Sequence, residues 1–147
     1  MSEPVAIDFA RQDLAEAVRV ALTREGHLLT AGEQRIAQGF LALPEEVASL
    51  YARLHGRRRG VFRLDQLDYA EISDVEAASR ALVEAGYAFD ESLLPTSVLL
   101  EARTVVELKV LCKGAGLKRT GKRADILTRL AGAPVRGAAL LPVLVLR

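Results

Sequence analysis

The sequence predicts a mainly α-helical protein in which a winged-helix-like domain with a small β wing is followed by a helix-loop-helix. Two observations support this prediction. Between residues 29 and 89 the local signals run helix, helix, strand, helix, strand, which is the order of a winged helix. Between residues 104 and 131 two short segments with apolar stripes flank a glycine-containing loop. Half of the 147 residues are hydrophobic, which is enough for a folded core.

The chain divides into four predicted segments. Residues 1–28 predict an N-terminal helix with an Ala/Leu/Val stripe, and residues 29–95 predict the winged-helix-like domain. Within it, short apolar runs at 61–64 and 87–89 predict the two strands of the wing. Residues 96–131 then hold the helix-loop-helix, and residues 132–147 form an apolar tail.

Helix starts inside these segments are marked by capping signals. Thr30 with Glu33 and Ser73 with Glu76 match the capping box, in which a hydroxyl and a carboxyl satisfy the first free N–H groups of a helix. Pro44 marks another start, because proline suits the first turn of a helix.

The helix-loop-helix has its own boundary signals. Thr104 with Glu107 forms a further capping box, and an apolar face begins at Leu108. Glycines at 114 and 116 end this helix, and a second helix begins after Gly121.

Positive charge is concentrated in this helix-loop-helix. Residues 107–130 hold seven basic and two acidic groups, whereas the whole chain holds 20 basic and 19 acidic groups. A basic island on an otherwise slightly acidic chain is typical of a surface that meets a polyanion. The start of the second helix also leaves N–H groups without partners at its positive dipole end, which favours phosphate. The alternative is a solvated helix-loop-helix with ordinary surface lysines.

We therefore expect phosphate contacts in this segment. The candidates are its exposed basic and loop residues, Lys109, Lys113, Lys118, Arg119, Thr120, Gly121, Lys122 and Arg123. A second group of arginines near the predicted wing consists of Arg57, Arg58, Arg59 and Arg63. These arginines are either phosphate contacts or a solvated basic turn. The helix predicted after residue 73 carries three acidic groups and one arginine, so we do not expect it to read bases in a major groove.

Within residues 96–131, the stretch from about Thr104 to Leu130 resembles the SAP motif, a small helix-loop-helix module that binds DNA. The likeness is carried by the Glu-Leu-Lys opening at 107–109, Gly116-Leu117 before the loop, Thr120-Gly121-Lys122 at the second helix start, and Ile126-Leu127-x-Arg129-Leu130 at its end. The resemblance implies duplex binding through backbone phosphates, with little reading of bases.

A longer stretch, about Leu28–Leu130, resembles the N-terminal region of the Fanconi-associated nuclease family. The likeness is carried by Leu43-Pro44, Leu50-Tyr51-x-Arg53-Leu54, the arginines at 57–59, Phe62-Arg63, Leu67-x-Tyr69-x-Glu71-Ile72 and Leu82-Val83-x-Ala85-Gly86-Tyr87. The resemblance implies that this part holds branched or flapped DNA. In that family a helical-repeat segment and a C-terminal VRR-NUC domain follow, and this last domain cuts DNA with a divalent metal.

We expect no catalytic residue, metal site or cofactor in this chain; divalent metal is expected only with the nuclease domain. The sequence stops at Arg147, where the helical repeats of that family would begin. A nuclease centre needs metal-holding carboxylates and a nearby lysine on strands. The nearest match, Glu107-Leu108-Lys109, has helical periodicity and is accounted for by the SAP resemblance. His27 and His55 are isolated, and Cys112 lies on an apolar helical face.

The tail, residues 132–147, has three open interpretations. It is the first piece of an absent domain, a segment that folds back on the SAP-like unit, or a contact with a second chain. Two functions from different classes follow. One is a module that binds double-stranded or branched DNA, alone or as the front of a nuclease. The other is a protein-interaction adaptor that joins a separate VRR-NUC catalytic chain or a second copy through this tail.

Cysteine content and hydropathy give an expected location. A single cysteine excludes an internal disulfide and suits a reducing compartment. No basic start followed by an apolar run marks a signal peptide, and the longest apolar run, 138–146, contains a proline and is too short to cross a bilayer. We therefore expect no membrane partner, and a cytoplasmic, nucleoid-associated location in a bacterium or a nuclear location in a eukaryote.

Overall fold

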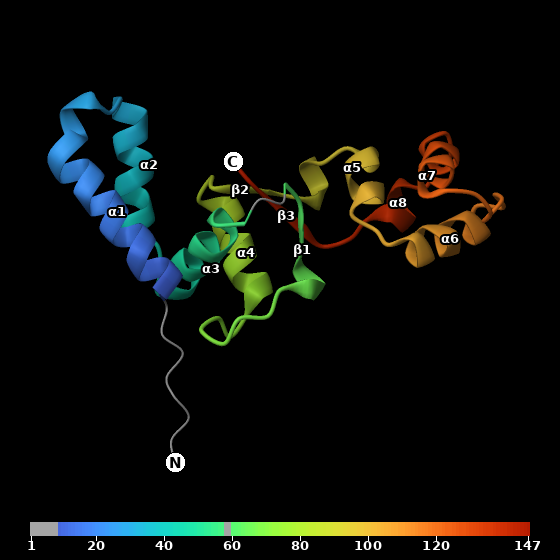
Figure 1. The fold of residues 1–147 in the computed structure, drawn as a ribbon, viewed down its shortest axis with the longest axis horizontal. Helices are drawn as coiled ribbons and strands as arrows, with labels where there is room; N and C mark the ends of the chain where they lie inside the picture. Colours follow the sequence, from blue (N-terminus) through green and yellow to red (C-terminus); the bar gives the residue numbers. More distant parts are fainter. Residues whose placement is uncertain (1–8, 58–59) are drawn as a thin grey trace, which may run out of the picture. The chain divides into compact units, whose positions relative to one another are not determined.

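The structure is a computed structural model that describes residues 9–57 and 60–147 (Figure 1). Residue contacts divide the chain into two compact units. The first comprises residues 9–57 and 68–87 together with Leu146, and the second comprises residues 60–67, 88–145 and 147. The mainly helical fold with a small β component is confirmed. In this division, residues 60–67 and 88–95 group with the SAP-like segment.

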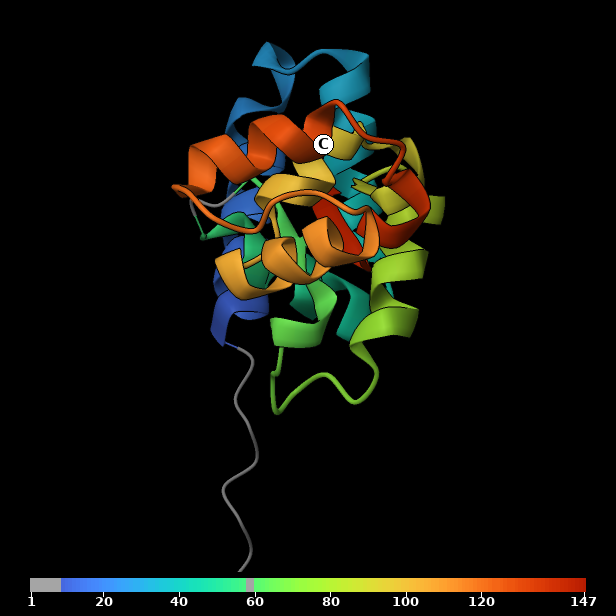
Figure 2. The same cartoon turned by 90° about the vertical axis from the view of Figure 1, so that its right-hand side faces the viewer.

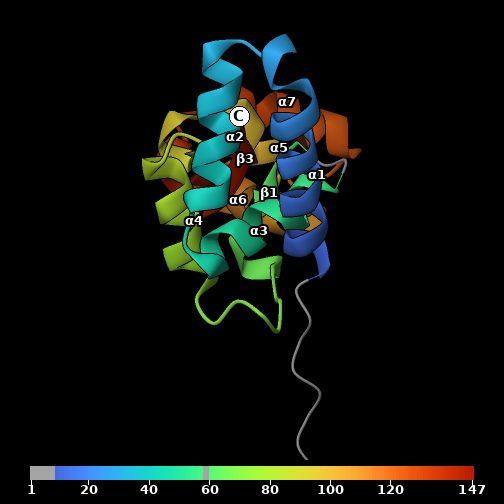
Figure 3. The same cartoon turned by 90° about the vertical axis from the view of Figure 1, so that its left-hand side faces the viewer.

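The first unit is helical, and Figure 3 shows it from the side of α1 and α2. Its helices are α1 (Phe9–Glu25), α2 (Ala31–Ala42), α3 (Glu45–His55) and α4 (Val75–Glu84), with a 3₁₀ turn at Gly26–Leu28 between α1 and α2. Ala15, Phe40 and Ala48 are buried where α1, α2 and α3 meet. The rings of Tyr51 and Tyr87 pack against this core. The Tyr87 hydroxyl donates a 2.7 Å hydrogen bond to the carbonyl of Ile36.

Two predicted helix starts in this unit are confirmed and one is wrong. Thr30 and Glu33 form both hydrogen bonds of the capping box, and Pro44 directly precedes α3. The predicted box at Ser73 does not form. The neighbouring Asp74 caps α4 instead, because its carboxylate accepts a 3.0 Å hydrogen bond from the N–H of Ala77.

The second unit combines short helices with a three-stranded sheet. Its helices are α5 (Thr96–Glu101), α6 (Val105–Gly114), α7 (Arg123–Ala131) and α8 (Arg136–Ala139), with 3₁₀ turns at Leu64–Gln66 and Glu91–Leu93. Its strands are β1 (Phe62–Arg63), β2 (Ala88–Asp90) and β3 (Val143–Leu146), in the order β1-β3-β2. β1 pairs antiparallel with β3, with Phe62 opposite Leu144 and Arg63 opposite Val143.

This sheet corrects the predicted wing. Both expected strands exist, as β1 and β2, but they do not pair with each other. The C-terminal strand β3 lies between them and takes the backbone hydrogen bonds of both. The N–H of Leu64 also donates to the carbonyl of Pro142, at 3.0 Å, which extends the contact between the two segments beyond the strands. Residues 80 positions apart in sequence therefore complete the sheet.

The apolar tail is part of the core of the second unit. Val135, Ala139, Leu141 and Val143 are buried in one cluster with residues of α5, α6 and α7. Of the three interpretations of residues 132–147, the structure supports the one in which the segment folds back. The physical reason is that the short helices α6 and α7 cannot bury their apolar faces against each other alone.

Among residues 9–57 and 60–147, no helix combines the length and apolar character needed to cross a lipid bilayer.

Candidate nucleic-acid interface

The candidate interface is built on α6 and α7, which Figure 2 shows facing the viewer. Leu108 and Cys112 of α6, and Ile126 and Leu130 of α7, are fully buried. The predicted capping box at the start of α6 is confirmed, with Thr104 and Glu107 each accepting a hydrogen bond from the other's N–H. The two helices are therefore fixed by one apolar seam, and their outward faces are free for other contacts.

The loop between the helices, residues 118–122, is called the basic loop below. Leu117 anchors its start, donating its N–H to the carbonyl of Cys112 at 2.8 Å. Gly121 sits near its end with φ +112°, a conformation that side chains with a Cβ rarely adopt. A Cβ at this position would lie 3.2 Å from the guanidinium of Arg129 and 3.3 Å from the side chain of Asp125. Glycine is therefore required here both by the backbone and by the available space.

Arg129, on the last turn of α7, holds the basic loop in place. Its guanidinium donates to the carbonyl of Lys118 at 3.1 Å and, by a shorter contact, to the carbonyl of Thr120. Two of the loop's carbonyls are thereby turned toward α7. Arg129 is not among the site residues predicted from the sequence. Its place in the Ile-Leu-x-Arg-Leu pattern was visible, but a bond to a loop nine residues upstream was not.

Five cationic side chains of this region are exposed, and they are called the cationic surface below. They are Lys109, Lys113, Lys118, Arg119 and Lys122. Within the described residues, none of the five is paired with a carboxylate. Thr120 and Gly121 are also exposed and lie between them in the loop. Because these charges meet solvent without a counter-charge, they are available to an incoming anion.

Asp125 is the acidic group in the first turn of α7. Its carboxylate accepts a 3.2 Å hydrogen bond from the N–H of Lys122 and so begins α7. The same arrangement leaves the Lys122 side chain out of the cap, because an ammonium group cannot accept a hydrogen bond.

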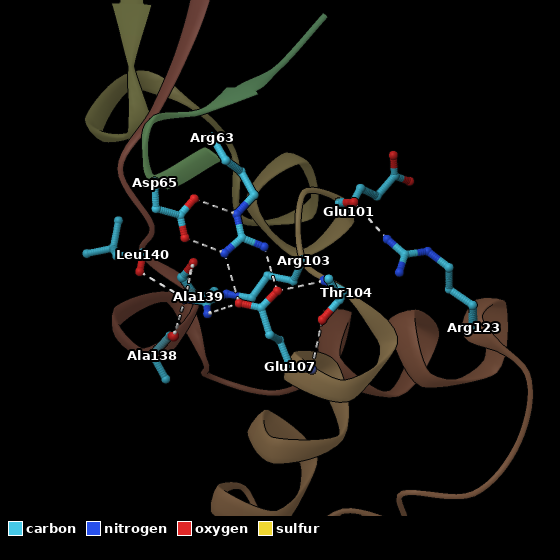
Figure 4. A network of polar contacts seen from close by, with 10 residues as sticks. All are labelled: Arg63, Asp65, Glu101, Arg103, Thr104, Glu107, Arg123, Ala138, Ala139 and Leu140. Atoms are coloured by element: carbon cyan, nitrogen blue, oxygen red, sulfur yellow. Dashed lines mark hydrogen bonds and ion pairs between the residues drawn. The ribbon is translucent and has the colours of Figure 1, made fainter. Parts of the chain in front are cut away.

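Arg123 is partly committed within the protein. Its guanidinium donates a 2.7 Å hydrogen bond to the backbone carbonyl of Glu101 at the end of α5, and its side chain is half-buried (Figure 4). Arg123 therefore ties α7 to α5.

Arg63 lies in an internal ion-pair network rather than on an open surface (Figure 4). Its side chain is 10% exposed. Its two terminal nitrogens meet the two carboxylate oxygens of Glu107, one at 3.0 Å, and Asp65 accepts from the same guanidinium at 2.8 and 3.1 Å. The expectation that Arg63 contacts DNA therefore does not fit the structure, since both N–H edges of its guanidinium already donate to Asp65 and Glu107.

The network extends to the tail through Arg103. Its guanidinium lies 3.6 Å from Glu107 and donates to the carbonyls of Ala138, Ala139 and Leu140 at 3.0 to 3.3 Å (Figure 4). A cation at the end of α8 satisfies carbonyls that have no partner within the helix. Glu107 therefore makes three interactions: it caps α6, pairs with Arg63 and lies close to Arg103.

This arrangement changes the acid–base behaviour of the two central groups. The side-chain hydrogen bonds from Arg63, followed by the backbone N–H of Thr104, lower the pKa of Glu107 to about 2. The hydrogen bonds to Glu107 and Asp65 raise the pKa of Arg63 in turn. Glu107 is therefore ionised throughout the physiological range, as an acceptor of structural hydrogen bonds.

The remaining predicted arginines belong elsewhere. Arg57 is in the first unit, where it donates to the Tyr69 hydroxyl at 3.2 Å. Arg58 and Arg59 lie outside the described residues. The described part of the chain also contains no group of three or more His, Cys, Asp or Glu side chains placed to hold a metal ion.

Two sequence families match this chain. The FAN1 HTH domain matches residues 11–89, and the SAP domain matches residues 99–133. Among curated proteins, the Fanconi-associated nuclease 1 homolog of Schizosaccharomyces pombe is 33% identical over 99 residues, which are 67% of this chain and 14% of that protein. The homolog of Arabidopsis thaliana is 28% identical over 111 residues, 71% of this chain and 12% of that protein.

Solved structures of paFAN1 bound to DNA are also similar to this chain. One is paFAN1 bound to DNA with a 2-nucleotide 5′ flap and a gap, with a TM-score of 0.80 and 26% identity over the whole of this chain. The other holds DNA with a 1-nucleotide 5′ flap and a gap, with a TM-score of 0.77, 28% identity and 96% of this chain covered. This chain spans 28% of the length of either structure. Since the FAN1 HTH match alone covers more than half of its residues, the chain belongs to the Fanconi-associated nuclease family.

Proposed function

We propose that this chain is a DNA-binding module that holds duplex or branched DNA through contacts to backbone phosphates. The observation that carries the proposal is the cationic surface: five exposed lysine and arginine side chains without counter-charges, three of them in a loop with a defined backbone. Each such contact releases counterions from the DNA, so several together provide affinity without reading bases.

The phosphate contacts proposed for the basic loop come from a fixed backbone. The basic loop supplies Lys118, Arg119 and Lys122 from a backbone fixed by Gly121 and Arg129. Lys122 also stands directly before α7, where the first N–H groups of the helix favour phosphate.

The family supports a branched substrate. The paFAN1 structures hold DNA with a 5′ flap and a gap, and this chain matches their fold over nearly its full length. We infer that the chain holds such DNA and does not cleave it. Glu107, the acidic residue of the Glu-Leu-Lys sequence, is engaged in the cap of α6 and with Arg63, so it is not arranged as a metal ligand. In a eukaryotic cell this role places the protein in the nucleus.

A binding assay with matched charge changes tests the proposal. Fluorescence anisotropy is measured on linear, forked and 5′-flapped duplexes of equal length. Lys122→Glu is compared with Arg80→Glu, the same charge reversal at an exposed position on α4. We expect Lys122→Glu to weaken binding at least tenfold and Arg80→Glu to leave it within about twofold, since only the former places a negative charge against phosphate. Equal effects of the two changes would contradict the proposed surface.

The same samples test the remaining parts of the proposal. With Mg²⁺ or Mn²⁺ added we expect no cleavage of any of the three substrates; metal-dependent products from purified wild-type chain would contradict the holding role. A higher affinity for the 5′-flapped duplex than for the linear duplex would support a branched substrate. Equal affinities would contradict that part of the proposal.

An adaptor that binds through its apolar tail receives less support. That function needs the apolar side chains of residues 132–147 to be available, but Val135, Ala139, Leu141 and Val143 are buried within the second unit. Deleting the tail would therefore disturb the fold of the DNA-binding unit itself.

A further inference from the structure

The outward face of α6 carries an unusual stripe of two valines and two lysines. Val106, Lys109, Val110 and Lys113 are spaced i, i+3, i+4 and i+7, which places them on one face of a helix. Val106 is 72% exposed and Val110 is 65% exposed, while Leu108 and Cys112 on the opposite face are fully buried. The stripe is therefore separate from the core of the unit and open to a partner.

The stripe does not contribute to helix stability. A β-branched valine in an exposed helical position loses side-chain rotamers without gaining packing. Two lysines spaced i, i+4 repel each other, by a few tenths of a kcal/mol in isolated helices. Alanine and glutamate would serve a solvated helix better at these positions. The stability of α6 therefore does not explain the composition of the stripe.

The charges on the stripe restrict what can cover the valines. Any partner that buries Val106 and Val110 also comes within reach of the ammonium groups of Lys109 and Lys113. An apolar protein surface would leave these two charges without water or counter-charge, which is unfavourable. A DNA strand offers both requirements at close spacing, because phosphates alternate with the apolar faces of deoxyribose rings and with base edges.

The stripe also leads directly into the basic loop. Lys113 lies in the last turn of α6, and the exposed Lys118 follows after the short turn at Gly116. The end of α6 that carries Lys113 is therefore joined to the basic loop by one short turn.

We propose that Val106 and Val110 form an apolar contact with the deoxyribose rings or base edges of the bound DNA, beside phosphates held by Lys109 and Lys113. This inference rests on the proposed DNA-binding function and deepens it. Lysines alone bind any polyanion, so the valines give the surface its preference for a nucleic acid over a simple chain of phosphates.

The double change Val106→Ala/Val110→Ala tests the contact without a loss of folding, because alanine has the higher helix propensity. Val105→Ala, on the same helix but off the stripe, is the control. Affinity is measured on a 5′-flapped duplex over a salt series, and separately on inorganic polyphosphate, which has charge but neither sugars nor bases.

We expect the double variant to bind the flapped DNA about tenfold more weakly, given several buried methyl groups lost, with an unchanged salt slope. Its affinity for polyphosphate stays within twofold of wild type, as does the affinity of Val105→Ala for DNA.

Three results would overturn the contact. The first is DNA affinity of the double variant within twofold of wild type. The second is an equal loss on DNA and polyphosphate, which would show a disturbed basic loop. The third is a change in self-association by sedimentation with DNA binding intact, which would assign the stripe to a second copy. If the wild-type chain binds no DNA at all, the proposed function itself fails, so the two failures are distinguishable.

Discussion

Replacing Glu107 by glutamine tests the central ion-pair network of the second unit. Glutamine keeps the size of the side chain and can still accept the hydrogen bond from the N–H of Thr104, so the start of α6 is largely preserved. What the change removes is the negative charge that faces Arg63, whose side chain is only 10% exposed. Arg63 is then left with Asp65, which is itself 53% exposed.

The expected loss of stability follows from this geometry. A hydrogen bond to a charged group contributes about 1.5–3 kcal/mol, and breaking a fully buried ion pair costs about 3–5 kcal/mol. Glu107 is 28% exposed, so solvent screens part of the interaction and the lower range applies. We expect the free energy of unfolding to fall by about 2 kcal/mol at pH 7. For a chain of this length that corresponds to a decrease in Tm of roughly 4–8 °C.

The pH dependence gives a second, independent check. The hydrogen bonds from Arg63 lower the pKa of Glu107 to about 2, below its ordinary value of 4.5. Since the folded state holds the carboxylate in its ionised form, the stabilisation is fully present above about pH 4.5 and is lost as the pH falls toward 2. The difference in stability between wild type and Glu107→Gln should therefore be largest near neutral pH and should shrink between pH 5 and pH 2.

The assay is thermal and urea denaturation followed by circular dichroism at a series of pH values. Glu101→Gln is the matched control, because the interaction with Arg123 uses the backbone carbonyl of Glu101 and not its carboxylate. A loss below about 0.5 kcal/mol for Glu107→Gln, equal to that of an ordinary surface change, would refute the network as a stabilising element. A difference that stays constant down to pH 2 would refute the role of the charge.

Three further predictions concern the basic loop and the tail. Gly121→Ala should destabilise the protein by about 1–2 kcal/mol and weaken DNA binding, because residue 121 has a φ of +112° and Arg129 lies close to it. Gly114→Ala is the control, since a Cβ at residue 114 meets nothing within 4 Å, and it should change neither stability nor binding. Calorimetry measures the stability and fluorescence anisotropy measures the binding. Arg129→Gln should lower DNA affinity several-fold with only a small decrease in Tm, since it frees the carbonyls of Lys118 and Thr120 while the lysines remain, and an affinity equal to wild type would remove its positioning role. Removing residues 138–147 should abolish the dispersed amide NMR signals of α6 and α7, because β3 and the buried Leu141 and Val143 are lost; a spectrum that keeps them would contradict the tail's place in the core.

Much of the helical framework could be predicted from local sequence. The capping boxes at Thr30 and Thr104 placed the starts of α2 and α6, because each box needs only residues within one turn. The box at Ser73 did not form, because of one local residue and one distant residue. The adjacent Asp74 is a stronger acceptor for a helix N-terminus, and Ser73 instead donates its N–H and hydroxyl to the carboxylate of Glu46.

The contacts that could not be predicted join residues far apart in sequence. Arg63 and Glu107 lie 44 positions apart, and nothing in the local pattern of either distinguishes a structural pair from two surface charges. The insertion of β3 between β1 and β2 likewise depends on which apolar segment reaches the sheet edge, a property of the whole fold. The basic loop was predictable because its charge, its glycine and the following helix start are consecutive.

The central claim is that the basic loop holds DNA by its phosphates, and the salt dependence of binding tests it most directly. The association constant is measured on a 5′-flapped duplex from about 50 to 200 mM salt for wild type and for Lys118→Gln/Lys122→Gln. Each phosphate contact contributes about 0.9 to the slope of log K against log salt, so the double variant should show a slope smaller by roughly 1.8 together with weaker binding at every salt concentration. An unchanged slope would show that these two lysines do not contact DNA and would contradict the account.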